Sequence, residues 1–451
     1  MPDSRQQWIV SAYALTFACF LMLWGRLADV YGKRLIFIFG SAWFTLTSLI
    51  VPFAPDEVTF DLFRGLQGLG AAANVPTALG ILGTTFPPSH AKNYAFACYG
   101  AGAPLGSVFG NILGGLVAQW LTWKWVFWLL AIIAAIVTLS GFLIIPSPPK
   151  PTQQLSVKSS VDWIGGAIIT VGLLILLFAL TEGNVVGWST PWIPVLIVLS
   201  LLIVVLFVVW QWYLEYKTAR RPLMKISIFY NHRFCAALVI MGLFFASFTN
   251  FLIFATYYYQ SYQGLSVIQT TLRFIPTGVA GVCCSFVMAH LLSRVKGVIL
   301  LTFATFCVAM SNLLFAVPIP PSTIYWAFGF PAMVLSVFGA DTMWPTLTLF
   351  ASHSLPQADQ ALGAALINAV GQIGRSIGLA IATAVETAVI AHDMQVDVKE
   401  VGSTMKNAVG NPALLKGLRS ADWVGFAYAA AAFMVAAFAF KGAGKVGIIK
   451  K

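Results

Sequence analysis

Charged residues are scarce in this chain. They make up only 9% of its 451 residues, whereas hydrophobic residues make up 59%. Soluble globular proteins carry about 25% charged residues. So few charges cannot cover a water-facing surface of this size, which excludes an ordinary soluble enzyme or binding domain. A lipid bilayer is the solvent that suits most of the surface of this chain.

Cysteines, glycosylation sites and catalytic clusters point to no other class of protein. All six cysteines fall inside apolar runs, so neither a disulfide framework nor a metal site is predicted. No Asn-x-Ser/Thr sequence occurs in the chain. The aqueous segments hold no paired carboxyl groups and no nucleophile elbow. We therefore predict that the protein is not an enzyme and uses no cofactor.

Long apolar runs dominate the chain. A spanning helix needs about 20 mostly apolar residues, and by that rule the sequence predicts thirteen helices. They cover approximately residues 7–27, 33–54, 59–86, 91–119, 124–145, 162–182, 191–214, 233–260, 267–293, 298–317, 323–351, 359–391 and 421–441. The predicted fold class is an all-α polytopic membrane protein.

Basic residues predict the orientation of these helices. Of the 26 Lys and Arg residues, 17 lie in alternate connections and the C-terminal tail, and seven lie on the opposite side. The positive-inside rule places the richer side in the cytoplasm, so the net charge of +11 reflects orientation and not nucleic-acid binding. The C-terminus is then cytoplasmic and Met1 lies outside. Because no cleavable signal precedes the first helix, we expect one further helix upstream of this chain.

The turn after the first predicted helix carries a distinctive pattern. It reads Gly25-Arg-Leu-Ala-Asp29-Val-Tyr-Gly32-Lys33-Arg34. Gly25 allows two helices to approach closely and Gly32 permits a tight turn, while Asp29 can meet a helix dipole or a basic partner. A loop whose charges are merely solvated is the alternative interpretation.

Three more elements follow in order along the chain. They are Leu62-Phe-Arg64-Gly-Leu-Gln67-Gly68, Gly102-Ala-Pro104-Leu-Gly106 and Trp123-Lys-Trp125-Val-Phe127-Trp128. Together with the first turn, they resemble the loop signature, the R-x-x-Q-G element, the antiporter helix element and the aromatic W-K-W-x-F element of the major facilitator superfamily. The resemblance implies a bundle of two pseudo-related halves in which the first helix of the family is missing.

Later segments resemble one branch of this family. Asp162-Trp163-Ile-Gly165 and Glu182-Gly183 are similar to the two inserted helices of the 14-span drug:proton antiporters, and Arg294-Val-Lys-Gly297 looks like a weakened copy of the first turn. The helices around Asp341 and Glu386 resemble a fungal subgroup of ammonium facilitators and of aminotriazole or boron resistance pumps. The predicted domains are an N-terminal half at 1–146, a cytoplasmic linker at 147–161, the inserted helices and their connection at 162–232, and a C-terminal half at 233–451.

Buried charges are the candidate site residues. Arg64 and Gln67 are expected to line the substrate cavity, as the resemblance implies. Asp341 lies about 15 Å from the cytoplasmic end of its helix, and a carboxylic acid at that depth can carry a proton because desolvation disfavours its charged form. A structural pair with Arg375 is the alternative. Glu386 lies nearer the outer end, where it either couples protons or faces interfacial water.

Glycine stripes mark two of the helices. Gly102, Gly106, Gly110 and Gly114 recur every four residues around Pro104, which is expected to bend the helix. Such stripes allow close helix packing, and the resemblance implies a hinge or a seal against proton leak instead. A second stripe, at Gly371, Gly374 and Gly378, is expected to serve packing alone.

The resemblance predicts export of a drug-like or toxic small molecule in exchange for protons. The two halves would rock about a central site, and the turn Gly25–Arg34 would latch the cytoplasmic side. The protein is expected to be a monomer in the plasma membrane, with a small-molecule substrate, protons and lipid as its partners. An uncoupled facilitator of ammonium or borate, or an inactive truncated product, are the alternatives.

Overall fold

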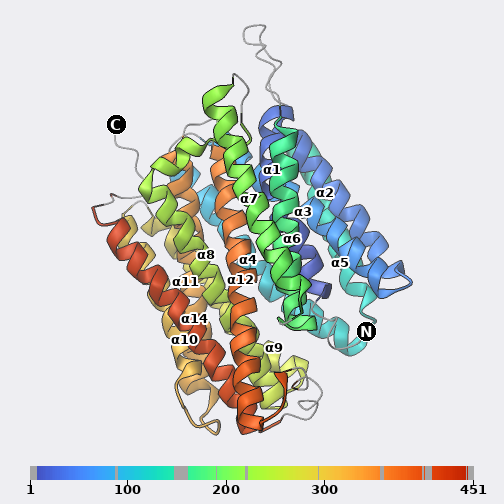
Figure 1. The fold of residues 1–451 in the computed structure, drawn as a ribbon, viewed down its shortest axis with the longest axis vertical. Coiled ribbons are helices and arrows are strands. Elements are labelled where there is room, and N and C mark those ends of the chain that lie inside the picture. The colour runs from blue at the N-terminus through green and yellow to red at the C-terminus, as the bar shows by residue number, and fades with distance from the viewer. Residues whose placement is uncertain are drawn as a thin grey trace. The chain divides into compact units, whose positions relative to one another are not determined.

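The molecule is built from long helices. The computed structural model describes residues 8–86, 90–146, 161–188, 190–218, 222–292, 294–355, 360–398, 401, 409–442 and 444. In this part of the chain there is no β-strand, and the long helices are α1 (Trp8–Tyr31), α2 (Lys33–Ile50), α3 (Glu57–Thr85), α4 (His90–Trp120), α5 (Lys124–Ile144), α6 (Trp163–Val186), α7 (Trp192–Lys217), α8 (His232–Tyr257), α9 (Val267–Leu291), α10 (Gly297–Ala316), α11 (Tyr325–Ser354), α12 (Gln360–Met394) and α14 (Pro412–Ala439) (Figure 1).

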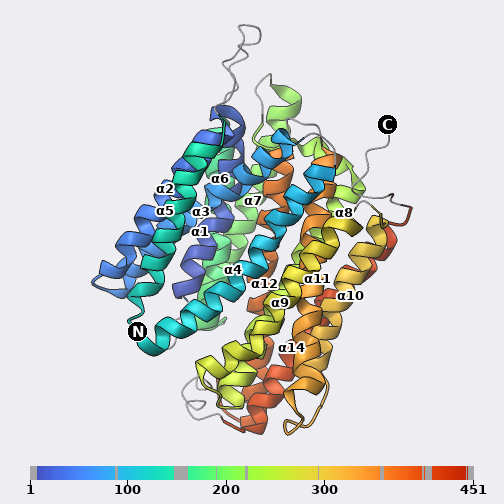
Figure 2. The same ribbon diagram turned by 180° about the vertical axis from the view of Figure 1, so that it is seen from behind.

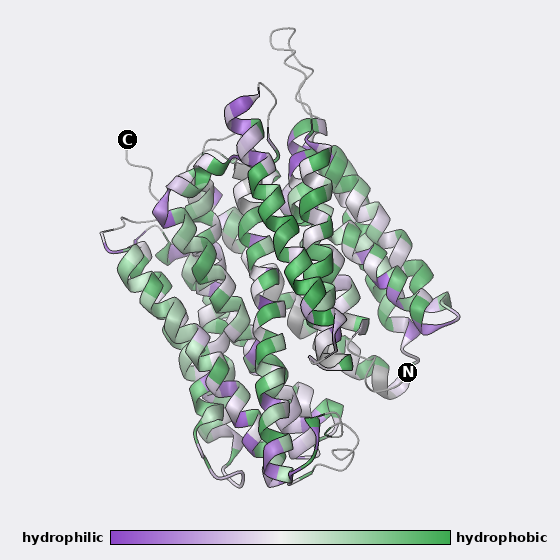
Figure 3. Cartoon of the chain, viewed as in Figure 1, coloured by the Kyte–Doolittle hydropathy of each residue, from purple (hydrophilic) through white to green (hydrophobic). Residues whose placement is uncertain are grey.

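Three short segments join the long helices. They are η2 (Val51–Phe53), η3 (Ile226–Tyr230) and the π-helical η4 (Tyr258–Tyr262). Among the described residues, eleven helices are long and apolar enough to cross a membrane. Figure 3 shows hydrophobic residues along most of the length of these helices.

The predicted fold class is confirmed. Each of the first twelve predicted segments corresponds to one helix, with ends that agree to within four residues or fewer. The thirteenth prediction is wrong at its start. Helix α14 begins at Pro412, nine residues before the predicted residue 421.

Polar residues explain this error. The side chain of Asn411 caps α14 by accepting a hydrogen bond from the backbone two residues later, at 2.8 Å. Lys416, Arg419 and Asp422 then lower the hydropathy of the first turns, although these turns are helical. Helix α14 therefore starts between the twelfth and thirteenth predicted helices, and Asp422 lies well inside it.

The chain forms two compact units. One unit comprises Met1–Phe86, Leu121–Asn231 and Ala351–Ala369, and the other comprises Pro87–Trp120, His232–Phe350 and Val370–Lys451. The predicted cytoplasmic linker at 147–161 lies outside the described residues except for Val161. The predicted division into halves and inserted helices stays a prediction.

In the first unit, α3 packs against α1 and α2, and the antiparallel pair α6–α7 packs against α1 through α6. Trp8 of α1 donates a hydrogen bond from Nε1 to Oε1 of Glu182 on α6, at 2.6 Å. Asp162 caps α6 by accepting from the backbone N–H of Gly165 at 2.8 Å. The same carboxylate accepts a hydrogen bond from Nε2 of Gln211 on α7, at 2.7 Å. Glu182 thus links α6 to α1, and Asp162 links α6 to α7.

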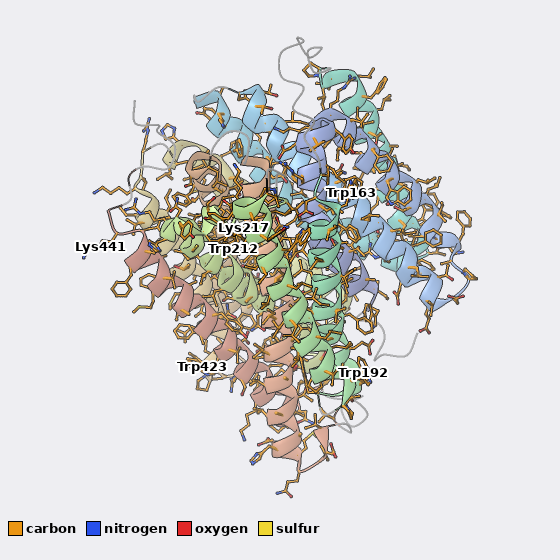
Figure 4. The ribbon with its side chains drawn as sticks, turned by 45° about the horizontal axis from the view of Figure 1, so that its top comes forward. Trp163, Trp192, Trp212, Lys217, Trp423 and Lys441 are labelled. Atoms are coloured by element: carbon orange, nitrogen blue, oxygen red, sulfur yellow. The ribbon has the colours of Figure 1, made fainter. Side chains whose placement is uncertain are left out.

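Exposed aromatic residues mark both ends of the α6–α7 pair. Figure 4 shows Trp163 and Lys217 at one end of the pair and Trp192 at the other. Trp163 is 57% exposed and Trp192 is 40% exposed. Tryptophan prefers the boundary between the acyl chains and water, and lysine at a helix end reaches the same level. These residues therefore fit the two faces of a bilayer.

In the second unit, α14 packs against α8 and α10, and α4 runs along α9 (Figure 2). Helix α12 approaches α8 through the glycine stripe predicted to serve packing. A Cβ atom on Gly374 would overlap the carbonyl oxygen of Gly242, and one on Gly378 would overlap the Cβ atom of Ala246. The two backbones are thus too close for any side chain at these positions.

We expect Gly374→Ala to destabilise the protein by about 1–3 kcal/mol, because the added methyl group meets backbone that cannot move aside. Gly106→Ala is the matched control, since no described atom lies within 4 Å of the position of its Cβ. The midpoint of thermal unfolding in detergent measures both changes. Equal midpoints for the two variants would contradict the close approach of α8 and α12.

Candidate functional site

Arg64 and Gln67 of α3 form a hydrogen-bonded network in the first unit. Nε of Arg64 donates to the carbonyl oxygen of Ile9 at 2.9 Å, and its Nη1 donates to Oε1 of Gln67. Nε2 of Gln67 donates to Oγ of Ser48 on α2 at 2.6 Å. The guanidinium carbon also lies 4.9 Å from the ring centre of Tyr13. The charge of Arg64 is thus satisfied by α1, α2 and α3, and its role in a cavity stays a prediction.

The turn between α1 and α2 is held by its basic residues. Gly32 has a φ of +102°, which a residue with a side chain rarely adopts. Nζ of Lys33 donates to the carbonyl oxygen of Gly80 on α3 at 3.3 Å. Nη2 of Arg34 donates to the carbonyl oxygen of Phe142 on α5 at 2.8 Å. The turn therefore fastens the end of α2 to two other helices of its own unit.

The remaining residues of this motif lie in α1. Gly25 is buried, and Asp29 lies close enough to Lys33 for their charges to interact. The role of this motif as a cytoplasmic latch stays a prediction.

The glycine stripe of α4 differs from the packing expectation. Helix α4 is continuous through Pro104. No described atom lies within 4 Å of a Cβ atom placed on Gly102, Gly106, Gly110 or Gly114. The stripe is therefore an open face among the described residues, in contrast to the closely packed stripe of α12.

Asp341 lies midway along α11 in the second unit. Its side chain is only 8% exposed, and its Oδ2 is buried with no hydrogen-bond partner among the described residues. Its surroundings include the thiol of Cys284 on α9, which lies 3.9 Å from the hydroxyl of Thr342. An unpaired carboxyl group at this depth is costly when charged and much less costly when it carries a proton.

Arg375 does not pair with Asp341, although the sequence left that pairing open. Within the part of the chain that the structure describes, no ion pair joins the two residues. The guanidinium group instead lies over the ring of Phe245 on α8, with 4.5 Å from its carbon to the ring centre. Asp341 and Arg375 therefore do not neutralise each other.

Glu386 and Asp422 bring a second set of carboxyl groups together. Glu386 of α12 is 9% exposed, so the alternative that it faces interfacial water is wrong in this structure. Asp422 of α14 is 3% exposed, its Oδ1 has no described hydrogen-bond partner, and its charge interacts with that of Glu386. Sequence reasoning missed Asp422 because the apolar-run rule began the last helix at residue 421.

A buried amide network also escaped the sequence analysis. Nδ2 of Asn312 on α10 donates to Oγ of Ser247 on α8 at 3.0 Å, and that hydroxyl donates to the carbonyl oxygen of Gly425 at 2.7 Å. Nδ2 of Asn250 on α8 donates to the carbonyl oxygen of Ala421 at 2.7 Å. The sequence signal that could have revealed it is a single asparagine inside each of two apolar helices, Asn250 in α8 and Asn312 in α10. The network ties α8 and α10 to α14 beside Asp422.

Metal binding has no support among the described residues, because no group of three or more His, Cys, Asp or Glu side chains there could hold an ion.

We expect Gly32→Ala to destabilise the protein by about 1–3 kcal/mol through backbone strain alone. Gly100→Ala is the matched control: both positions have no described atom within 4 Å of a Cβ, but Gly100 lies in the α-helix α4. Thermal unfolding in detergent again measures the effect. A Gly32→Ala variant as stable as the control would show that the turn relaxes without cost.

Comparison with known proteins identifies the family. The Major Facilitator Superfamily profile matches residues 1–379. The "Low affinity ammonium transporter" of Saccharomyces cerevisiae is 30% identical over 85% of this chain and 74% of its own length. "Efflux pump terJ" of Aspergillus terreus is 29% identical over 96% of this chain and 80% of its own length. The "Major facilitator superfamily multidrug transporter mdr3" of Aspergillus fumigatus is 29% identical over 92% of this chain and 71% of its own length.

Solved structures share the fold. The human organic anion transporter MFSD10 superimposes with a TM-score of 0.63 at 14% identity, covering 94% of this chain and 83% of its own. The proton:xylose symporter XylE superimposes with a TM-score of 0.59 at 11% identity, covering 96% and 85%. The helices, the ordered signature elements and these similarities agree: the chain is an integral multi-pass membrane protein that belongs to the Major Facilitator Superfamily.

Proposed function

We propose that this transporter exports drug-like or toxic small molecules in exchange for protons, by alternating access of a central site. The observation that carries the proposal is Asp341, a buried carboxyl group halfway along a spanning helix with no hydrogen-bond partner among the described residues. Its protonated form is compatible with a closed apolar environment, whereas its charged form needs water or a cation. Loss of the proton therefore favours a conformation that exposes this helix to water, which couples proton movement to the transport cycle.

Relatives support export as the direction. Their names include efflux pumps of Aspergillus terreus, a multidrug transporter of Aspergillus fumigatus and a puromycin resistance protein of Streptomyces alboniger. Export of toxic molecules from a cell requires the plasma membrane, and the excess of basic residues in alternate connections supports a cytoplasmic C-terminus. We propose a monomer in this orientation.

Further residues have supporting roles in this proposal. The carboxyl pair Glu386 and Asp422 is a second place where a proton can be held, because two neighbouring buried carboxyl groups cannot both be charged without repulsion. The turn Gly25–Arg34 latches the cytoplasmic side. Arg64 and Gln67 contribute to the substrate cavity when their network opens.

One relative favours a second function. The ammonium transporter of Saccharomyces cerevisiae suggests a facilitator that carries a small solute such as ammonium or borate without protons. In that case Asp341 would serve only the structure, and transport would follow the solute gradient alone.

Transport in proteoliposomes separates the two functions. The purified chain is reconstituted, and movement of puromycin and of methylammonium is followed with and without an imposed pH gradient. We expect the gradient to drive puromycin transport and Asp341→Asn to reduce that transport by about tenfold or more, within the usual range of coupling between two ligands.

The control variant is Asp393→Asn, which removes a carboxylate that pairs with Lys416 near the surface. It is expected to transport like the unmodified chain. Methylammonium movement that ignores the pH gradient and survives Asp341→Asn, without puromycin transport, would establish the facilitator instead.

A further inference from the structure

Arg375 occupies an unusual position in the second unit. Its guanidinium group stacks on Phe245 of α8, and the edge of Trp344 on α11 meets the same phenylalanine with 5.5 Å between ring centres and an angle of 87°. Phe248 packs against Phe245 in a similar way, at 6.2 Å and 86°. The ring that lies under the guanidinium group is thus itself flanked by Trp344 and Phe248.

The glycine stripe of α12 fixes this arrangement. Gly371, one turn before Arg375, leaves room for the ring of Phe245, because a Cβ there would lie 3.2 Å from that ring. Gly374, the preceding residue, brings the backbone of α12 against Gly242 of α8. The arginine and the ring beneath it are thus held by backbone contact and not by flexible side chains.

No protein group neutralises this cation among the described residues. Arg375 is half-buried and takes part in no ion pair or hydrogen bond there, and its Nε is buried without a partner. Among the described residues, no ionisable side chain contributes to its electrostatic environment. A charge that is partly removed from water without a counter-charge destabilises the fold.

Acidic groups described in the same unit do not supply this counter-charge. Glu386 and Asp422 interact with each other, Asp341 has a thiol as its ionisable neighbour, and the exposed Asp393 pairs with Lys416. The negative charge that would stabilise Arg375 must therefore come from outside these groups.

We propose that Arg375 is a binding site for a monovalent organic anion, with a carboxylate at the guanidinium group and an apolar body against Trp344 and Phe248. Phe245 lies against the guanidinium group, and Nη1 and Nη2 make no hydrogen bond among the described residues, so these two atoms can donate two parallel hydrogen bonds to a carboxylate. One cationic group calls for one negative charge. Half-buried aromatic side chains favour an organic molecule over a small inorganic ion.

The anion site itself does not depend on the proposed export function. Only the statement that the bound anion is a transported substrate rests on that function. It deepens that function by naming a class of molecule: amphipathic monocarboxylates. It also disfavours ammonium at this position, because a fixed cation repels another cation.

Equilibrium binding tests the site without transport. The chain is placed in nanodiscs of neutral phosphatidylcholine, and calorimetry at neutral pH measures binding of 2-naphthoate, 2-naphthamide and 2-naphthylmethylammonium, which share one apolar body and differ in charge. We expect the carboxylate to bind about tenfold or more tightly than the amide, as a charged hydrogen-bonded pair allows. The ammonium compound is expected to bind most weakly.

Variants locate the effect. Arg375→Gln should remove the preference for the carboxylate, and Arg375→Lys should keep part of it, because the charge remains while the paired hydrogen bonds are lost. Arg273→Gln is the matched control. Arg273 also lies over aromatic rings, those of Tyr259 and Tyr325, but its Nη1 donates to the carbonyl oxygen of Gln269 near the start of α9.

The outcomes separate this inference from the proposed function. Equal binding of carboxylate and amide by the unmodified chain, or a preference that survives in a folded Arg375→Gln variant, overturns the anion site. The midpoint of thermal unfolding shows whether the Arg375→Gln variant is folded. The Arg375→Lys variant gives a second substitution at the same position that keeps the charge. Carboxylate binding that depends on Arg375 supports the site even if pH-driven export of puromycin is absent, in which case only the proposed export function fails.

Discussion

The absence of water in the hydrocarbon core is the constraint on which this structure depends. Backbone N–H and C=O groups have no solvent partner there, so the described chain is helical wherever it is apolar. The hydrophobic effect cannot drive helices together inside lipid, and small residues that permit close contact take its place. Gly374 and Gly378 on α12 show this directly, since the backbone of α8 occupies the space of their missing side chains.

The same constraint acts on polar side chains, and the two units meet it differently. In the first unit, Arg64 and Gln67 find partners on α1 and α2. In the second unit, Asp341 is buried and Arg375 half-buried near the middle of their helices, and neither has such a partner among the described residues. A stable fold alone would favour pairing them. Unpaired charges of this kind are typical of sites where protons or ligands are exchanged.

Apolar helices in a membrane protein also need polar anchors. The α6–α7 pair is almost wholly apolar and exposes many of its side chains to lipid. Asp162 holds α6 to α7, and Glu182 holds α6 to Trp8 of α1. In lipid a few hydrogen bonds suffice to choose the neighbour of an apolar helix, because apolar faces alone do not discriminate between neighbours.

The sequence by itself determined the helices, their order and the family, because a run of about 20 apolar residues has one stable form in a bilayer. It failed at the start of α14, where Lys416, Arg419 and Asp422 are polar yet helical, so the carboxyl pair of Asp422 and Glu386 was out of reach. Only the tertiary structure decided which glycine stripe packs closely against other described residues, that of α12 and not that of α4. It also decided that Arg375 meets Phe245 and not Asp341. Helical periodicity gives the face on which a residue lies, but the partner depends on how neighbouring helices are rotated and shifted, which no single segment encodes.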